Sequence, residues 1–464
     1  MRRGFSVVAV LCLLTPALCA QQAMSPEMKG RVDAAVKQVM ENTGVPSAVV
    51  GVVLGGKVAY TAAFGKARLS PEVAATVAMH YPVGSISKQF TAACVLLLVE
   101  DGKMRLDDPV AKWFPELTRA KDVTVRMLLS HTSGYSDYAP QDYTIPAWTK
   151  PTDPLKLVHE WAEKPLDFEP GTKWQYSNTN FVLTALIIEK VTGQPFWTVL
   201  KTRVLDPLGL HEVLNLDTDR ARVEPQGTER HALGPLRPAV LEAPGWYFGD
   251  ATLAMPVSDL LKWDISMIDQ KLMKPESYRA METEVLLKNG APTGYGLALD
   301  VAVKNGHRVL THEGEVGGFV ADNVILPDDH AAIAVLTNQE ASGAAAAIAA
   351  EIETILQNPV VSNGASPAEA QVKAMLDGLE DGKLDRDALT EDCSFYFSKE
   401  TVEDFASSLK PLGWVVEVKQ TREALRGGMT LRVFEVNFKA KKVNVITYTM
   451  PGGKLEQFQA DAAE

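Results

Sequence analysis

The 464-residue chain has room for two or three domains, and 46% hydrophobic residues are enough for a large core. The formal charge of −12 argues against a nucleic-acid partner, because an acidic surface repels phosphates. Cysteines and histidines do not show the spacing of a zinc site, so we predict no metal and no other cofactor.

Residues 1–20 have the pattern of a secretory signal peptide. Arg2 and Arg3 form a positive end, Val7–Leu14 is too short an apolar run to cross a bilayer, and Ala20 precedes a plausible cleavage site. A membrane anchor is the alternative interpretation. Later segments lack about 18 uninterrupted apolar residues. We therefore expect a periplasmic or secreted protein without stable membrane insertion after signal cleavage.

The first predicted helix and strands follow shortly after the signal peptide. Ser25, with proline next to it, predicts the start of a helix that ends at Gly44. Two strands, Ala48–Leu54 and Val58–Phe64, flank a two-glycine turn, which is typical of a hairpin.

Ser85 and Lys88 stand three residues apart at the head of the apolar segment Phe90–Val99. If a helix begins there, both side chains lie on one of its faces. Burial of the helix would hold the pair rigidly and lower the pKa of the amine, so that it can accept a proton. The alternative is a helix cap and a solvent-exposed lysine. A second such pair, Ser407 and Lys410, is interpreted as a surface helix end.

Two further motifs follow the serine–lysine pair. Tyr176 and Asn178 supply a phenol and an amide two residues apart, and a serine hydrolase without a His–Asp pair needs a phenol or an amine as proton acceptor. His312-Glu313-Gly314 comes later in the chain. The alternatives are a loop aromatic with an Asx-turn for the first motif, and a strand end with a bulge for the second.

The predicted strands come from both ends of this region. Val309–Thr311, Phe319–Leu326 and Ala331–Thr337 are expected to join the N-terminal hairpin, followed by a helix over Ala344–Leu356. Helices and loops fill residues 103–260. The sequence therefore predicts an α/β fold, an antiparallel sheet flanked by helices with an inserted helical lobe.

Residues 358–366 are expected to be a linker between a hydrolase domain, 25–357, and a small α+β domain, 367–464. The latter carries no catalytic constellation, so we expect an accessory role or homodimer formation. A disulfide between Cys94 and Cys393 is not expected, because the first lies in an apolar helix and the second beyond the linker.

The three motifs together resemble the class C β-lactamase, DD-peptidase and esterase group of serine hydrolases. The resemblance covers roughly residues 25–356 and implies a β-lactamase/transpeptidase-like fold. Four more segments carry it: Val123–Tyr135, Pro170–Asn178, Val191–Pro195 and Asp206–Leu210.

The resemblance also implies roles. Ser85 would be the nucleophile that forms an acyl-enzyme, with Lys88 or Tyr176 as its base. Tyr176 would pass the proton to the leaving group. Asn178 would hold Lys88 and hydrogen-bond the acyl group of the substrate.

His312 would face Tyr176, and the backbone N–H groups of Ser85 and Glu315 would form an oxyanion hole. Gly314 would let the substrate approach the strand closely. Glu313 stands where the family has a small hydroxyl residue that helps to bind a substrate carboxylate. At about 4 Å and an effective dielectric of about 20 it would repel that carboxylate by about 4 kcal/mol, unless strand alternation turns it away.

The sequence thus predicts a secreted serine hydrolase that acts on an ester or amide, with a small molecule or peptide as substrate. The alternatives are a β-lactamase or DD-peptidase, and an inactive homologue that binds a cell-wall peptide.

Overall fold

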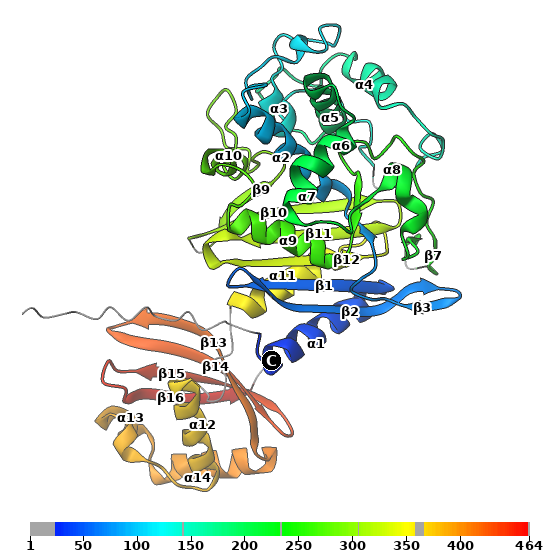
Figure 1. Ribbon diagram of the computed structural model, residues 1–464. Helices are drawn as coiled ribbons and strands as arrows, with labels where there is room; N and C mark the ends of the chain where they lie inside the picture. Colours follow the sequence, from blue (N-terminus) through cyan, green and yellow to red (C-terminus); the bar gives the residue numbers. More distant parts are fainter. Residues whose placement is uncertain (1–23, 142, 233, 305, 358–365, 463–464) are drawn as a thin grey trace, which may run out of the picture. The chain divides into compact units, whose positions relative to one another are not determined.

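The structure is a computed structural model that describes residues 24–462, apart from 142, 233, 305 and 358–365 (Figure 1). The chain divides into two compact units, residues 1–359 and 360–464, and each is described by itself. The predicted signal peptide and most of the predicted linker lie outside the described residues. None of the described helices is long and apolar enough to cross a bilayer.

The first unit is built on a seven-stranded antiparallel sheet in the order β3-β2-β1-β12-β11-β10-β9 (Figure 1). Its strands are β1 (Ser47–Leu54), β2 (Lys57–Leu69), β3 (Glu72–Ala74), β9 (Asp300–Lys304), β10 (His307–Val316), β11 (Phe319–Leu326) and β12 (Ala331–Thr337). β1 pairs with β12, so the prediction that both ends of this region build one sheet is confirmed.

Helices and short strands complete the unit. The helices are α1 (Pro26–Thr43), α2 (Ser87–Glu100), α3 (Val125–Leu129), α4 (Pro154–Ala162), α5 (Asn178–Thr192), α6 (Phe196–Leu200), α7 (Asp206–Leu208), α8 (Leu216–Asp219), α9 (Val257–Ile268), α10 (Pro275–Met281) and α11 (Ala344–Gln357). The short strands are β4 (Tyr81–Pro82), β5 (Leu214–Asn215), β6 (Thr228–Glu229), β7 (Arg237–Pro238) and β8 (Leu253–Met255).

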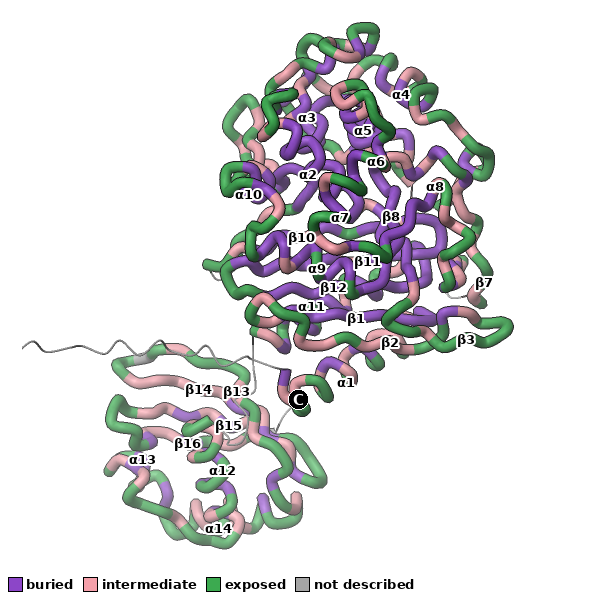
Figure 2. Tube along the Cα trace, viewed as in Figure 1, coloured by how far each residue is buried: buried purple, intermediate pink, exposed green. Residues whose placement is uncertain are grey.

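Each face of the sheet has its own apolar core, because successive strand residues point to opposite sides. In β1, Val50 and Val52 pack toward α1 and α11, whereas Val49 and Val53 join the larger core around α2 and α9. Figure 2 shows the central strands β1, β11 and β12 buried, with exposed segments around them. The predicted sheet flanked by helices, with a helical lobe, is confirmed.

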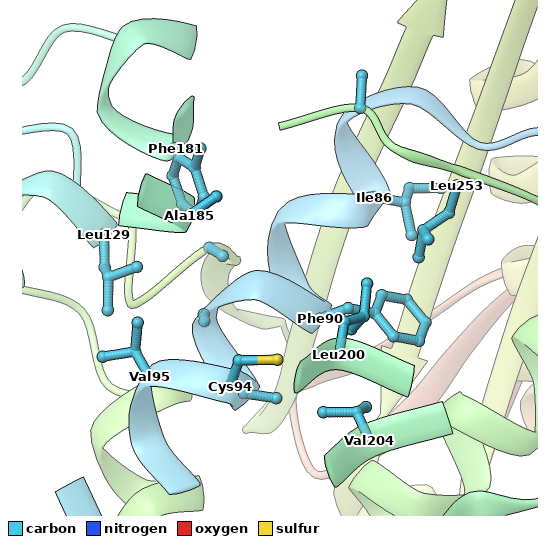
Figure 3. Close-up of a cluster of buried hydrophobic side chains, with 14 of the residues drawn as sticks. Ile86, Phe90, Cys94, Val95, Leu129, Phe181, Ala185, Leu200, Val204 and Leu253 are labelled. Atoms are coloured by element: carbon cyan, nitrogen blue, oxygen red, sulfur yellow. The ribbon is translucent and has the colours of Figure 1, made fainter. Parts of the chain in front are cut away.

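α2 lies in the middle of the larger core and is buried almost all round. Figure 3 shows its apolar side chains, including Phe90 and Val95, among residues of the lobe such as Leu129, Phe181 and Leu200. A short 3-10 turn, η1 (Gly84–Ile86), leads into the helix and carries Ser85. Packing on all sides therefore fixes the segment that holds the serine–lysine pair.

Local signals explain several element ends. Ser25 accepts a hydrogen bond from the Met28 amide (3.1 Å), and Gly44 ends α1 in the left-handed region at φ 74°, as predicted. The strand predicted over Val309–Thr311 was too short, because β10 continues to Val316 and contains the third motif. β9 was missed because most of its residues are exposed at the sheet edge and show no alternation.

The described residues of the second unit form a four-stranded antiparallel sheet in the order β13-β14-β15-β16 with three α-helices. Its helices are α12 (Pro367–Glu380), α13 (Glu391–Tyr396) and α14 (Lys399–Leu409), and its strands are β13 (Val415–Arg426), β14 (Met429–Phe438), β15 (Lys442–Thr449) and β16 (Leu455–Ala462). Leu376, Phe397, Phe434 and Phe458 belong to a core of its own. The predicted small α+β fold is confirmed. Cys94 in the first unit and Cys393 in the second are buried free thiols.

Candidate active site

Ser85 and Lys88 meet at the head of α2. Lys88 Nζ donates to Ser85 Oγ over 2.8 Å, while Ser85 itself stays half-buried beside a cavity. Lys88 is 0% exposed, so the alternative of a solvent-exposed lysine is wrong. The corresponding pair at Ser407 and Lys410 lies on the exposed end of α14, as predicted.

Both residues of the second motif lie next to the same amine, Lys88 Nζ. Asn178, the first residue of α5, accepts a hydrogen bond from Lys88 Nζ at 2.7 Å. Its own amide nitrogen is directed to Asp137 (3.3 Å) and to the Ala139 carbonyl (3.4 Å), two residues that also line the cavity. Tyr176 borders the same cavity as Ser85, and its ring lies 5.1 Å from Lys88 Nζ. The structure thus brings all four predicted residues of the first two motifs together.

Burial sets the protonation of this cluster. Desolvation lowers the pKa of Lys88 to about 8, although Asp250 and Asp137 act in the opposite direction. Burial also raises the pKa of the Tyr176 phenol well above its usual range. At neutral pH the phenol is therefore un-ionised, whereas the amine titrates close to physiological pH.

Two carboxylates near Lys88 were not predicted. The backbone carbonyl of Asp250 accepts from Lys88 Nζ at 3.2 Å, and its carboxylate lies 4.0 Å from the same nitrogen. Asp137 accepts from the Asn178 backbone N–H at 2.9 Å and so orients the start of α5. Both residues lie in loops, where no periodicity marks them, and only the fold brings them to α2.

His131 lies within the segment Val123–Tyr135, and the sequence analysis assigned it no role. It is fully buried, and its Nδ1 accepts from the Ser177 backbone N–H at 3.1 Å. Its ring lies against Tyr176, with 4.2 Å between ring centroids. Burial and the neighbouring Lys88 hold the pKa of His131 well below its usual value, so the imidazole is neutral. His131 therefore holds the tyrosine motif in place through its contacts with the Tyr176 ring and the Ser177 backbone.

The third motif lies on β10, and His312 faces the same core as α2. Its Nδ1 hydrogen-bonds the Glu313 carbonyl (2.6 Å), and its Nε2 hydrogen-bonds the Tyr295 hydroxyl (2.9 Å). Burial lowers the pKa of His312 to about 3, so it brings no positive charge to the site at neutral pH. Its ring centroid is 6.2 Å from that of Tyr176, with Tyr295 also beside it.

Gly314 lies where β10 touches the backbone just before Ser85. A Cβ there would lie 1.9 Å from the Val83 carbonyl oxygen and 3.1 Å from the Ser85 nitrogen. The missing side chain therefore allows a close approach by the chain's own backbone. Gly84 has a φ of 50°, and a Cβ on it would lie 2.4 Å from the Glu315 nitrogen. These contacts set the Ser85 and Glu315 backbone nitrogens side by side.

Strand register turns the Glu313 side chain away from His312. Glu313 pairs with Asp322 and His312 with Asn323. Asn323 bonds Gln89 of α2 (3.1 Å), on the face of the active site, so Glu313 and Asp322 lie on the opposite face. Burial and Glu313 together raise the pKa of Asp322 to about 7. Glu313 is exposed and still borders the cavity at the end of the sheet.

A cavity of about 620 Å³ opens over Ser85. Acidic and aromatic side chains dominate its wall, and no Lys or Arg occurs among the described lining residues. The carboxylates are Asp137, Glu242, Asp250, Asp300, Glu313, Glu315 and Glu340. The aromatic residues include Tyr138, Tyr143, Trp148, Trp246 and Tyr247. In the described part of the chain, no group of three or more His, Cys, Asp or Glu side chains could hold a metal ion.

Comparison with known proteins agrees with this geometry. The penicillin-binding protein 4* of Bacillus subtilis (strain 168) is 28% identical over 329 residues, which are 66% of this chain and 71% of that protein. A D-aminopeptidase of Cereibacter sphaeroides (strain KD131 / KCTC 12085) is 30% identical over 308 residues, 65% of this chain. The aligned part spans 58% of that D-aminopeptidase, so it is less than two thirds of its length.

Solved structures share the fold. A D-stereospecific amidohydrolase from Streptomyces sp. has a TM-score of 0.59 and 28% identity, and covers 71% of this chain and 99% of its own. An octameric penicillin-binding protein homologue from Pyrococcus abyssi has a TM-score of 0.62 at 21% identity and covers 94% of this chain and 96% of its own. The family model described as Beta-lactamase matches residues 32–356. Because that match spans well over half of the sequence, the chain belongs to the beta-lactamase family.

Proposed function

We propose that this protein is a serine hydrolase that cleaves an amide or ester through an acyl-enzyme on Ser85. One observation carries this proposal, the 2.8 Å contact between Ser85 Oγ and the amine of the fully buried Lys88. A serine becomes nucleophilic when an adjacent base takes its proton. The relatives named D-aminopeptidase support an amide as the substrate.

Lys88 is the better proton acceptor of the two candidates. Its pKa of about 8 leaves a neutral fraction near physiological pH, while the Tyr176 phenol keeps its proton. As Ser85 Oγ bonds to the substrate carbonyl carbon, its proton passes to neutral Lys88. The Tyr176 hydroxyl then gives its proton to the departing amine or alcohol and recovers one from the Lys88 ammonium. Water hydrolyses the ester on Ser85 by the reverse sequence.

The backbone N–H groups of Ser85 and Glu315 are the proposed oxyanion hole. Their nitrogens lie side by side because Gly84 and Gly314 let the two backbones touch. Donors fixed before the reaction stabilise the developing negative charge without reorganisation. This arrangement suits acyl transfer and gives no advantage to a protein that only binds a peptide.

The charges around the cavity favour an amine-bearing substrate over one with a carboxylate. Seven carboxyl groups line the cavity, and none of the described lining residues is a cation at neutral pH, since His312 is neutral. Burial raises the pKa of Asp250 and Glu340 to about 7 and that of Asp300 to about 6, so the negative charge grows as the pH rises. A β-lactam carries a carboxylate that these charges would repel, so β-lactamase or DD-peptidase activity is the less favoured alternative. We propose a small amide or ester with a free ammonium group, such as an amino-acid amide.

We also propose that the predicted signal peptide, residues 1–20, directs export of the enzyme to the periplasm or out of the cell. N-terminal sequencing of the protein from its native host tests it. A mature chain that starts at Gln21 is expected, whereas a retained Arg2 and Arg3 would contradict export.

The nucleophile is tested with Ser85→Ala. We expect loss of fluorophosphonate labelling and a fall of several orders of magnitude in turnover of amide and ester substrates, with a nearly unchanged melting temperature. Ser407→Ala is the matched control, because it removes the serine of the second motif copy on the surface. Labelling of the Ser85→Ala protein at the wild-type rate would refute the mechanism. A wild type without any labelling or turnover would instead favour the inactive binding protein.

A further inference from the structure

Lys88 has the surroundings of an ammonium ion. Its three N–H groups have three acceptors: Ser85 Oγ (2.8 Å), Asn178 Oδ1 (2.7 Å) and the Asp250 carbonyl (3.2 Å). A fully buried cation without a nearby anion is costly and tends to lose its proton. Hydrogen bonds to neutral acceptors reduce that cost but do not neutralise the charge.

Asp250 supplies the missing anion. In the described part of the chain it is the one carboxylate within 4.0 Å of Lys88 Nζ, and its side chain is 3% exposed. The Tyr138 hydroxyl lies 2.9 Å from Asp250 Oδ2 and 2.6 Å from the Trp246 carbonyl, so these two acceptors share its one proton. Asp250 Oδ1 is buried, with no hydrogen-bond partner among the described residues. The carboxylate also lies 4.0 Å from Lys88 Nζ, so its charge acts on that amine at short range.

We propose that Asp250 is a positioning residue whose buried carboxylate is the counter-ion of Lys88 and sets the pH range in which Lys88 can accept the proton of Ser85.

The other groups facing Lys88 cannot take over this role. His131 and His312 are neutral and Tyr176 is an un-ionised phenol, so none of the three supplies a negative charge to Lys88. Asp137 also favours the charged form of Lys88, but it raises the pKa of Lys88 less than Asp250 does. Its carboxylate is hydrogen-bonded to Asn178 and Ala139. Burial raises the pKa of Asp250 itself to about 7, while Lys88 and Tyr138 act in the opposite direction. Above that pH the anion is present beside Lys88.

The direction of the effect follows from the charges. Desolvation lowers the pKa of Lys88, and Asp250 partly restores it, to about 8. Removal of the anion should therefore let Lys88 lose its proton at a lower pH. The same change should weaken the amine as a base, because the ammonium formed during acylation would lose its counter-ion. A purely structural residue would change the rate without moving the pH dependence.

Asp250→Asn tests this role, since it keeps the backbone carbonyl and the side-chain size but removes the charge. Lysine labelled with ¹³C at Cε reports the titration of Lys88, whose signal is identified by its loss in Lys88→Arg. We expect the Lys88 midpoint to fall by about one pH unit or more in Asp250→Asn. Asp264→Asn is the matched control. Asp264 lies on α9, is fully buried and accepts a hydrogen bond from Asn323 of β11, so its substitution should leave the Lys88 midpoint unchanged.

The kinetic readout is the rate of Ser85 labelling by a fluorophosphonate between pH 5 and 10. In Asp250→Asn the acid limb should move to lower pH while the plateau rate falls. Tyr138→Phe, which removes the hydrogen bond to the carboxylate, should move the limb in the same direction by less. Identical Lys88 midpoints in wild type and Asp250→Asn would overturn the proposal. Because this role rests on the proposed function, absent labelling of the wild type would refute that function, whereas the titration decides on Asp250 by itself.

Discussion

At the scale of single residues, the acidic wall of the cavity should decide which substrates react. Three anilides with one leaving group test this: D-alanine p-nitroanilide is cationic, its N-acetyl derivative is neutral, and its N-succinyl derivative is anionic. We expect kcat/KM to fall in that order, because lining carboxylates such as Asp300 and Glu242 attract a cation and repel an anion. The preference should shrink with salt, since the screening length falls from about 30 Å at 0.01 M to about 3 Å at 1 M.

Glu313→Gln is the companion variant in this series. Since register places Glu313 with Asp322 on the face opposite His312, its removal should raise the rate of the anionic anilide by less than about tenfold. A larger gain would mean that this carboxylate faces the bound substrate. Equal rates for all three anilides at low salt would refute the charge preference.

Residue types at fixed spacing could be predicted, but their distant partners could not. The Ser85–Lys88 contact follows from helix geometry, because residues three apart share a face. The Asp250 contact joins positions 162 apart and depends on how a loop packs on α2. The orientation of Glu313 was open in the sequence, since β10 was predicted three residues long and the motif lay outside it.

At the scale of elements, the contact of β10 with η1 builds the proposed oxyanion hole. A Cβ on Gly314 would meet the Val83 carbonyl at 1.9 Å, so Gly314→Ala must push the two backbones apart. We expect the labelling rate to fall by about 100-fold or more, the effect of losing one oxyanion donor, together with a lower melting temperature.

Gly343→Ala is the matched control for this variant. Nothing lies within 4 Å of a Cβ at Gly343, and its φ is not in the left-handed region. It should keep the wild-type labelling rate and melting temperature. A Gly314→Ala protein labelled as fast as this control would show that the backbone contact does not matter for acylation.

At the scale of the whole molecule, the two compact units differ in what they carry. The family match ends at residue 356, and Ser85, Lys88, Tyr176 and His312 all belong to the first unit. The second unit has its own core, which includes Phe434 and Phe458. Three alternating runs, Trp414–Lys419, Thr430–Lys439 and Val443–Met450, and a turn at Gly452–Gly453 predict its sheet from the sequence. The role of the unit could not be predicted, because it carries no catalytic motif.

A stop after Gln357 should therefore leave a folded, active enzyme. The cut falls at the end of α11, whose apolar face packs on the sheet together with α1 and stays complete. We expect a labelling rate within about twofold of the full chain and a cooperative thermal transition, because a unit with its own core can fold alone. Sedimentation of both forms tests homodimer formation by the second unit, which should be lost on truncation. A truncated chain that is folded by circular dichroism but not labelled would show that residues 358–464 contribute to the active site.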